Sequence, residues 1–205
     1  MAADYLCPAS FGEAEFVERR SKFIGRVWPV ENEAEALDLI KSVRERHWDA
    51  THNCYAFLLR EGGASRHSDN GEPSGTAGAP ILEVLTRSKV TNALCVVTRY
   101  FGGVLLGAGG LVRAYSHSAK IALAAAGTTE MTLCAHFSTT VPYALLNQVR
   151  GLVSAWKGTE DSAEYLSEVI IRASVPIGGF EEFSAKLRDL SAGAVSPRFI
   201  GERYK

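Results

Sequence analysis

The chain has 205 residues, of which 46% are apolar and 22% are charged, and its formal net charge is −1. This composition is ordinary for a globular protein and excludes the overall basic field that is typical of nucleic-acid-binding chains. The sequence contains no run of about 18 apolar residues, so we expect no helix that spans a membrane.

The first 130 residues alternate strands, helices and glycine-rich loops. We expect residues 1–12 to form a loose arm, followed by strands over 14–20 and 22–30. Asn32, with Glu35 three residues later, predicts a helix N-cap, and apolar spacing continues this helix to about His47. We predict a strand over 52–60, a long polar loop over 61–76 and a helix over 77–87. A buried strand over 93–98 and a helix over 109–126, which Gly127 ends, complete this part.

The remaining residues follow a simpler order of elements. A strand over 131–141 precedes a helix that Pro142 opens, and residues 159–163 and 165–175 pair as a hairpin. A helix over 180–190 and a strand over 195–204 follow. The order βαββαβ is that of the ferredoxin-like split unit. We therefore predict the α+β class and two domains, residues 14–127 and residues 129–205.

The first glycine-rich loop carries most of the polar side chains that could do chemistry. It contains Asp69, Glu72, Ser74, Gly75 and Thr76. The order G-E-P-S-G does not match the G-x-S-x-G pattern of a nucleophilic serine. Three interpretations remain: Ser74 or Thr76 caps the next helix, the loop contacts an anion or a partner, or Ser74 is a nucleophile.

A second glycine-rich loop leads into the helix predicted over 109–126. Its glycines are Gly102, Gly103, Gly107, Gly109 and Gly110. Ala108 stands where a Walker A loop needs lysine, and Val112 stands where a Rossmann fingerprint needs its third glycine. The free amides of a helix N-terminus still favour an anion. Arg99 and Arg113 could converge on a phosphate or carboxylate there, or they could bond loop carbonyls and nearby acids.

Charge is distributed unevenly between the two halves. Residues 60–120 carry seven Lys or Arg and four Asp or Glu, whereas residues 129–205 carry eight and nine. We therefore expect an anion-binding face in the first domain.

His52 and Cys54 lie two residues apart on a predicted strand and so point to the same face. They could form a catalytic pair, or simply be one polar and one apolar side chain of the strand. The histidines show no metal-ligand spacing, and no metal or cofactor is predicted. The four cysteines form no CxxC pair and the N-terminus shows no signal-peptide pattern, so we expect a cytoplasmic protein with reduced thiols.

Three long motifs carry a family resemblance. HNCYAF (52–57), SDNGEPSGTAGAPIL (68–82) and VVTRYFGGVLLGAGGLVRAY (96–115) resemble the IMPACT/YigZ family. The resemblance implies a first domain like domain 2 of ribosomal protein S-five and a ferredoxin-like tail like domain V of elongation factor G. It also implies a role in translation, since eukaryotic relatives act on an amino-acid-starvation kinase pathway by protein binding. Two departures are Asn70, where the family has a second aspartate, and Ala79, where a basic residue is usual.

Our leading hypothesis is a non-enzymatic binding protein that is linked to the regulation of translation. Its two glycine-rich loops, with Arg99 and Arg113, would bind an anionic partner: RNA, a ribosome-associated protein or an acidic protein surface. The alternative is a hydrolase that acts on a small phosphorylated or peptide substrate through Ser74, His52 and Asp69. A third hypothesis is an interaction module whose loops pack only on each other. No membrane association is expected.

Overall fold

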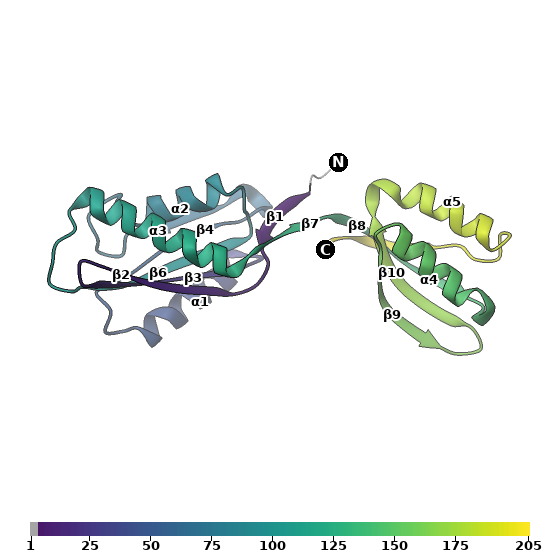
Figure 1. Ribbon diagram of the computed structural model, residues 1–205. Coiled ribbons are helices and arrows are strands. Elements are labelled where there is room, and N and C mark those ends of the chain that lie inside the picture. Colours follow the sequence, from purple (N-terminus) through teal and green to yellow (C-terminus); the bar gives the residue numbers. More distant parts are fainter. Residues whose placement is uncertain (1–3) are drawn as a thin grey trace. The chain divides into compact units, whose positions relative to one another are not determined.

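The computed structural model describes residues 4–205, which divide into two compact units (Figure 1). One unit consists of residues 5–130, and the other of residues 131–205 with Asp4. Each unit combines helices with an antiparallel sheet, so the predicted α+β class is confirmed. The likeness to ribosomal protein S-five stays a prediction.

A five-stranded antiparallel sheet forms the centre of the unit 5–130. Its strands, in spatial order, are β2 (Gly12–Glu18), β3 (Ser21–Pro29), β6 (Ala93–Tyr100), β4 (His52–Leu58) and β5 (Ser65–Ser68). In the register of the three central strands, Arg99 on β6 is opposite both Phe23 on β3 and His52 on β4. The strand ends thus bring His52 and Arg99 together although they are far apart in the chain.

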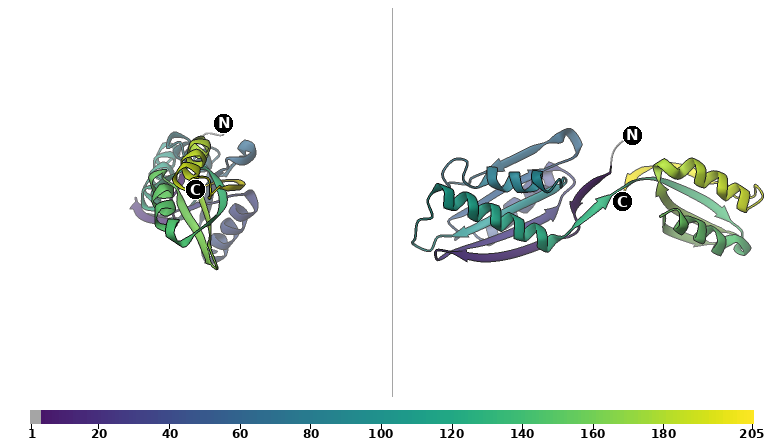
Figure 2. Two further views of the ribbon diagram at one scale, coloured as in Figure 1. Left: turned by 90° about the vertical axis from the view of Figure 1, so that its right-hand side faces the viewer. Right: turned by 45° about the horizontal axis from the view of Figure 1, so that its top comes forward.

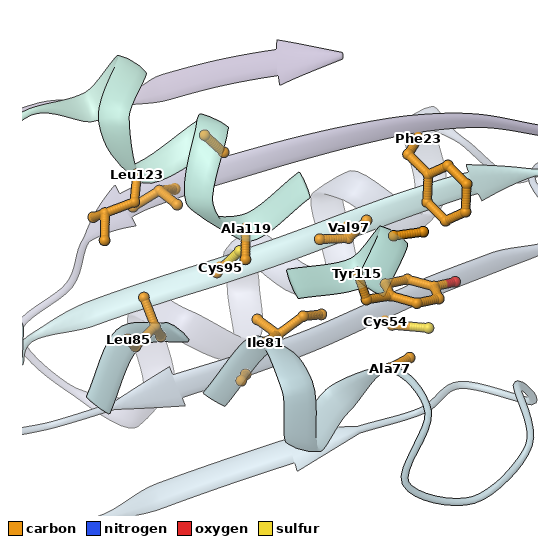
Figure 3. Packing of buried hydrophobic residues seen from close by; sticks show 14 of the residues in the cluster. Phe23, Cys54, Ala77, Ile81, Leu85, Cys95, Val97, Tyr115, Ala119 and Leu123 are labelled. Carbon is orange, nitrogen blue, oxygen red and sulfur yellow. The ribbon is translucent and has the colours of Figure 1, made fainter. Parts of the chain in front are cut away.

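Helices cover both faces of this sheet, as Figure 1 shows. Helix α1 (Glu33–Arg46) lies on one face, and α2 (Gly78–Arg87) and α3 (Ala108–Ala126) lie on the other. Side chains such as Ile81 and Tyr115 fill the space between the sheet and the helices α2 and α3 (Figure 3). Helix α3 approaches β3 closely because Gly25 has no side chain; a Cβ there would lie 2.5 Å from the Ser118 carbonyl oxygen.

Some local expectations agree with the structure and two differ. Asn32 Oδ1 accepts from the Glu35 amide at 2.9 Å, as the N-cap pattern predicts. The arm expected over residues 1–12 is wrong for residues 5–8, which form β1 (Tyr5–Pro8) and pair with β7 (Thr128–Met131). Residues 1–3 lie outside the described residues. Strand β5 takes residues 65–68 from the predicted long loop, which leaves residues 69–77 as the first glycine loop. The second glycine loop is residues 101–107.

The unit 131–205 has the predicted order of elements. Its elements are β8 (Leu133–Val141), α4 (Leu146–Ala155), β9 (Thr159–Tyr165), β10 (Val169–Pro176), α5 (Phe180–Leu190) and β11 (Arg198–Tyr204). The spatial strand order β11-β8-β10-β9 is that of a ferredoxin-like sheet. Both helices contribute to one core with β8 and β10. Figure 2 shows this unit, in green to yellow, from two further directions. Short 3₁₀ turns occupy Tyr143–Leu145 and Ile177–Gly179 in this unit, and another occupies Glu61–Gly63 in the unit 5–130.

Candidate functional site

A buried ion pair joins the first glycine loop to the end of β6. The Arg99 side chain is almost fully buried, as is that of Glu72, and Arg99 Nη1 lies 2.6 Å from Glu72 Oε1. The hydroxyl of Tyr115 on α3 donates to the same oxygen at 2.7 Å. Burial raises the pKa of Tyr115, so the phenol stays protonated as a donor. Arg99 Nη2 donates to Ser21 Oγ at 3.3 Å. The charge of Arg99 is therefore already balanced within the protein.

His52 is oriented toward this pair by the first glycine loop. Its Nδ1 lies 2.9 Å from the Asn70 carbonyl oxygen, which can only accept, so Nδ1 carries the proton. Its Nε2 lies 3.8 Å from Glu72 Oε2. Nε2 therefore faces the Glu72 carboxylate without a hydrogen bond to it.

Asp69 organises the first glycine loop. Its carboxylate accepts from the amides of Gly75, Ala77 and Gly78 at 2.9, 3.0 and 2.8 Å, which caps the start of α2. Burial raises the pKa of Asp69, but these three hydrogen bonds outweigh it and the net pKa is lowered. The hypothesis that Ser74 or Thr76 is the cap is wrong, because Thr76 Oγ1 donates to the Pro73 carbonyl at 2.6 Å instead.

The second glycine loop is more exposed. Leu105 at its tip has 80% of its surface exposed. Gly103 and Gly107 have φ values of +83° and +70°, which favour glycine. Gly107 precedes α3 without a side-chain hydrogen bond to the first turn of that helix. The loop therefore leaves apolar side chains and helix amides accessible.

The two glycine loops meet at one cavity of about 360 Å³, here called the loop pocket. His52 and the Glu72–Arg99 pair contribute to its lining. Most of the remaining wall is apolar and comes from both loops and the start of α3: Pro73, Phe101, Leu105, Leu106 and Leu111. The structure thus joins Glu72, Arg99 and Gly107 of the predicted site at this pocket. Asp69, Gly75 and Thr76 do not line it and instead form hydrogen bonds within the first loop.

Arg113 lies at a different cavity. A pocket of about 310 Å³ is lined by Arg113, Gly110 and Arg19, and Leu106 is shared with the loop pocket. Arg99 does not line it. The expected convergence of Arg99 and Arg113 on one anion is therefore wrong: a buried strand end holds one arginine and an exposed helix face holds the other. Gly109 lies beneath Arg113, whose Nη1 would be 3.6 Å from a Cβ at that position.

Residues 19–123 match the Impact N-terminal domain, and residues 139–194 match a domain of unknown function (DUF1949). "IMPACT family member YigZ" of Escherichia coli is 36% identical over 187 residues, which cover 90% of this chain and 92% of that protein. The chain belongs to the IMPACT family. Family member YvyE of Bacillus subtilis is 41% identical over 150 residues, 73% of this chain and 69% of that protein.

The match to a eukaryotic IMPACT relative covers about half of the chain. "Protein IMPACT" of Rattus norvegicus is 31% identical over 115 residues, 51% of this chain and 34% of that protein. A solved structure titled "Crystal structure of an hypothetical protein" is 33% identical with a TM-score of 0.64, and covers 99% of this chain and 100% of that one. The residues that line the loop pocket all lie within the part of the chain that matches the Impact N-terminal domain.

The hydrolase hypothesis needs a nucleophile next to a base, and the candidates do not meet. Ser74 is exposed and does not line the loop pocket. Cys54 Sγ donates to the Asp69 carbonyl at 2.9 Å, and burial raises the pKa of its thiol to about 12. Among residues 4–205, His52 makes no hydrogen bond to either side chain. In the same part of the chain, no three His, Cys, Asp or Glu side chains cluster as metal ligands. No helix there is long and apolar enough to span a membrane.

Sequence reasoning missed three contributors. Tyr115 ends the third family motif, but nothing local indicates that its hydroxyl reaches Glu72 across the fold. Leu105 is exposed at the tip of the second glycine loop, and no local pattern distinguishes an exposed leucine there from a buried one. Arg19 had a visible signal: it lies in the polar run ERRSK (18–22), at the junction of two consecutive predicted strands, where a tight turn is expected.

Proposed function

We propose that this chain is a non-enzymatic, cytoplasmic binding protein linked to the regulation of translation, which binds an acidic protein surface through its two glycine loops. An apolar side chain of the partner enters the loop pocket, and neighbouring carboxylates lie near the start of α3. The observation that carries this proposal is the meeting of both loops at one largely apolar cavity. The link to translation is supported by the family resemblance.

The apolar anchor follows from the chemistry of the pocket wall. Since Glu72 balances the charge of Arg99, the pocket offers little net attraction for an isolated anion. Phe101, Leu105 and Leu111 instead provide apolar surface that gains from excluding water. Large apolar side chains in small, well-shaped pockets dominate the energy of many protein interfaces.

The acidic character of the partner follows from the helix terminus beside the pocket. Gly107 and Ala108 line the pocket, and α3 begins there without a side-chain cap. First-turn amides and the positive end of the helix dipole favour carboxylates. Residues 5–130 carry fourteen Lys or Arg and fourteen Asp or Glu, so the unit lacks the excess of positive charge that RNA backbones require. This favours an acidic protein segment over RNA.

A binding role is favoured over catalysis because, among the described residues, no hydroxyl or thiol of the pocket is hydrogen-bonded to His52 as a nucleophile to its base. Within the described residues, His52 faces a carboxylate rather than a hydroxyl or thiol, and Cys54 is held as a buried thiol. Of the charged groups that line the cavity, Glu72 and Arg99 form an ion pair with each other.

The test is a fluorescence-anisotropy titration of short labelled peptides onto the full chain. One peptide carries Phe or Leu flanked by glutamates, and a matched peptide carries the same residue flanked by lysines. We expect saturable binding of the acidic peptide alone, and Leu105→Ser should weaken it at least about tenfold. Leu166→Ser is the matched control, since Leu166 is also exposed but lies in the other unit.

RNA serves as the competing probe. Structured and single-stranded RNA and a non-nucleic polyanion are titrated over a range of salt concentrations. A steep fall of log K with log salt for RNA, with no peptide binding, would replace the acidic protein surface by nucleic acid. Equal binding of the acidic and lysine-flanked peptides would contradict the role of the helix terminus.

A further inference from the structure

A second cavity, distinct from the loop pocket, lies between the β2–β3 turn and helix α3. This hairpin–helix pocket has a volume of about 310 Å³. Arg19, Arg113 and His117 line it, together with Glu18, Phe16 and Leu106. Two permanent cations and an imidazole therefore face one carboxylate in a concave site that the proposed function does not use.

Neither arginine of this pocket is balanced by an acid. Within residues 4–205, the only side-chain hydrogen bond of Arg19 is a long one, from Nη1 to the Leu105 carbonyl at 3.4 Å, and Arg113 makes no ion pair or hydrogen bond. The Arg113 guanidinium lies back over Gly109 in the first turn of α3. The state of Arg113 contrasts with that of Arg99, which is neutralised by Glu72.

The backbone of the β2–β3 turn holds Arg19 in an unusual conformation. Glu18 pairs with Ser21, so Arg19 and Arg20 form a two-residue turn, with φ values of +44° and +67°. Such turns prefer Asn and Gly, because a Cβ is disfavoured at positive φ. The conformational preference of the turn therefore does not explain why arginine occupies position 19. A use for the side chain that lines the pocket would explain it.

We propose that the hairpin–helix pocket binds a small phosphate monoester carried on a hydroxyl-bearing skeleton, the chemistry of a sugar phosphate. Guanidinium groups donate paired hydrogen bonds to phosphate oxygens, which assigns the phosphate to Arg19 and Arg113. His117, whose ring packs edge-on against Phe16 at a centroid distance of 4.7 Å, supplies a further N–H donor.

The other lining residues select the skeleton. The Glu18 carboxylate is an acceptor only, so it pairs with a ligand hydroxyl rather than with phosphate. Phe16 and Leu106 offer apolar surface to the carbon skeleton. A cavity of about 310 Å³ is at the small end of ligand pockets, which suits a monosaccharide phosphate better than a polymer.

The experiment is an amide-resolved NMR titration of the full chain at constant ionic strength with glucose 6-phosphate, inorganic phosphate and glucose. We expect saturable shifts at Arg19, Gly110 and Arg113, with tighter binding of glucose 6-phosphate than of phosphate and no binding of glucose. Equal affinity for glucose 6-phosphate and phosphate would overturn the assignment of Glu18. No saturable shift with either phosphate, or shifts centred on His52 and Phe101, would overturn the site.

Two variants and a control test the assignment of charges. Arg113→Gln should weaken glucose 6-phosphate binding at least about tenfold, since a charge-assisted hydrogen-bond pair is lost. Lys120→Gln is the control, because Lys120 is exposed on the same helix but does not line the pocket. An equal loss in the control would show unspecific charge attraction and overturn the site.

Arg19→Asn separates binding from folding. Asparagine tolerates positive φ better than arginine, so the melting temperature should stay constant or rise while glucose 6-phosphate binding weakens. Unchanged binding would overturn the role of Arg19. Leu105→Ser, which tests the proposed function, should leave glucose 6-phosphate binding intact, so the two proposals can fail separately.

Discussion

The two glycine loops meet at one pocket but are stabilised in opposite ways. In the first loop, residues 69–77, the Asp69 carboxylate holds three backbone amides and Glu72 is buried against Arg99. In the second loop, residues 101–107, Leu105 is exposed and no side chain caps the helix that follows. The first loop is held by its own hydrogen bonds and a buried ion pair, and the second presents an apolar side chain to solvent.

The glycines of the two loops therefore have different roles. In the first loop they allow a backbone conformation, and in the second they also leave the backbone exposed. Gly71 and Gly75 allow positive φ in a loop whose polar groups are bonded internally. Gly103 and Gly107 also allow positive φ, but they flank exposed apolar side chains. Substitutions of the hydrogen-bonded side chains of the first loop should therefore reduce stability, and those at the tip of the second should reduce binding.

The largest loss of stability is expected for Glu72→Ala. It leaves the Arg99 guanidinium buried without a counter-charge, which costs about 3–5 kcal/mol. Urea unfolding followed in the unit 5–130 measures it. The double variant Glu72→Gln with Arg99→Met removes both charges and should recover most of the loss. A cost below about 1 kcal/mol for Glu72→Ala would show that the first loop is not held by this pair.

Gly102→Ala tests where the second loop is anchored. A Cβ at this position would lie 2.0 Å from the Arg20 carbonyl oxygen, so the backbone must shift, at a cost of about 1–3 kcal/mol. Gly103→Ala is the comparison: nothing lies within 4 Å of its Cβ, so only the strain of a φ of +83° is expected, about 1 kcal/mol. Thermal unfolding of both variants checks this order, and the reverse order would contradict it.

Asp69→Ala should cost about 1–2 kcal/mol through loss of the cap on α2. Ser74→Ala is the matched control and should change the free energy of unfolding by less than about 0.5 kcal/mol, because Ser74 is exposed. Chemical denaturation at neutral pH measures both. If Ser74→Ala were the more costly of the two, the assignment of the cap would be refuted.

The Asp69 contribution should also depend on pH. Its pKa is lowered in the folded protein, so the stabilisation is present in full above the unfolded-state value of about 3.9. It is lost as the pH falls through the lower folded-state pKa. The difference in free energy of unfolding between the native chain and Asp69→Ala should therefore shrink in acid. A constant difference would show that the carboxylate charge does not contribute.

The smallest effect on stability is expected at Leu105, where the effect on binding is greatest. Leu105→Ser should change the free energy of unfolding by less than about 0.5 kcal/mol, since the side chain is 80% exposed. The same variant should lose the acidic peptide. A clear loss of stability without loss of binding would assign Leu105 to packing and remove the contrast between the loops.

Local patterns in the sequence determined most of the elements. The N-cap at Asn32, the stop at Gly127 and the βαββαβ order of the second unit were all readable, because each depends on neighbours within one or two turns or strands. Strand β5 was missed because its polar residues, SRHS, show no apolar alternation; pairing with β4 makes it a strand.

Only the tertiary structure decided how the site is assembled. The register between β4 and β6 places His52 opposite Arg99, and helix α3 carries Tyr115 to the same carboxylate that Arg99 binds. Arg99 and Arg113 looked equivalent in sequence as two cations beside one glycine loop. Their separation into a neutralised pair and an unpaired charge depends on which element each lies on and on an acid 27 residues away in the chain, and no local pattern contains that information.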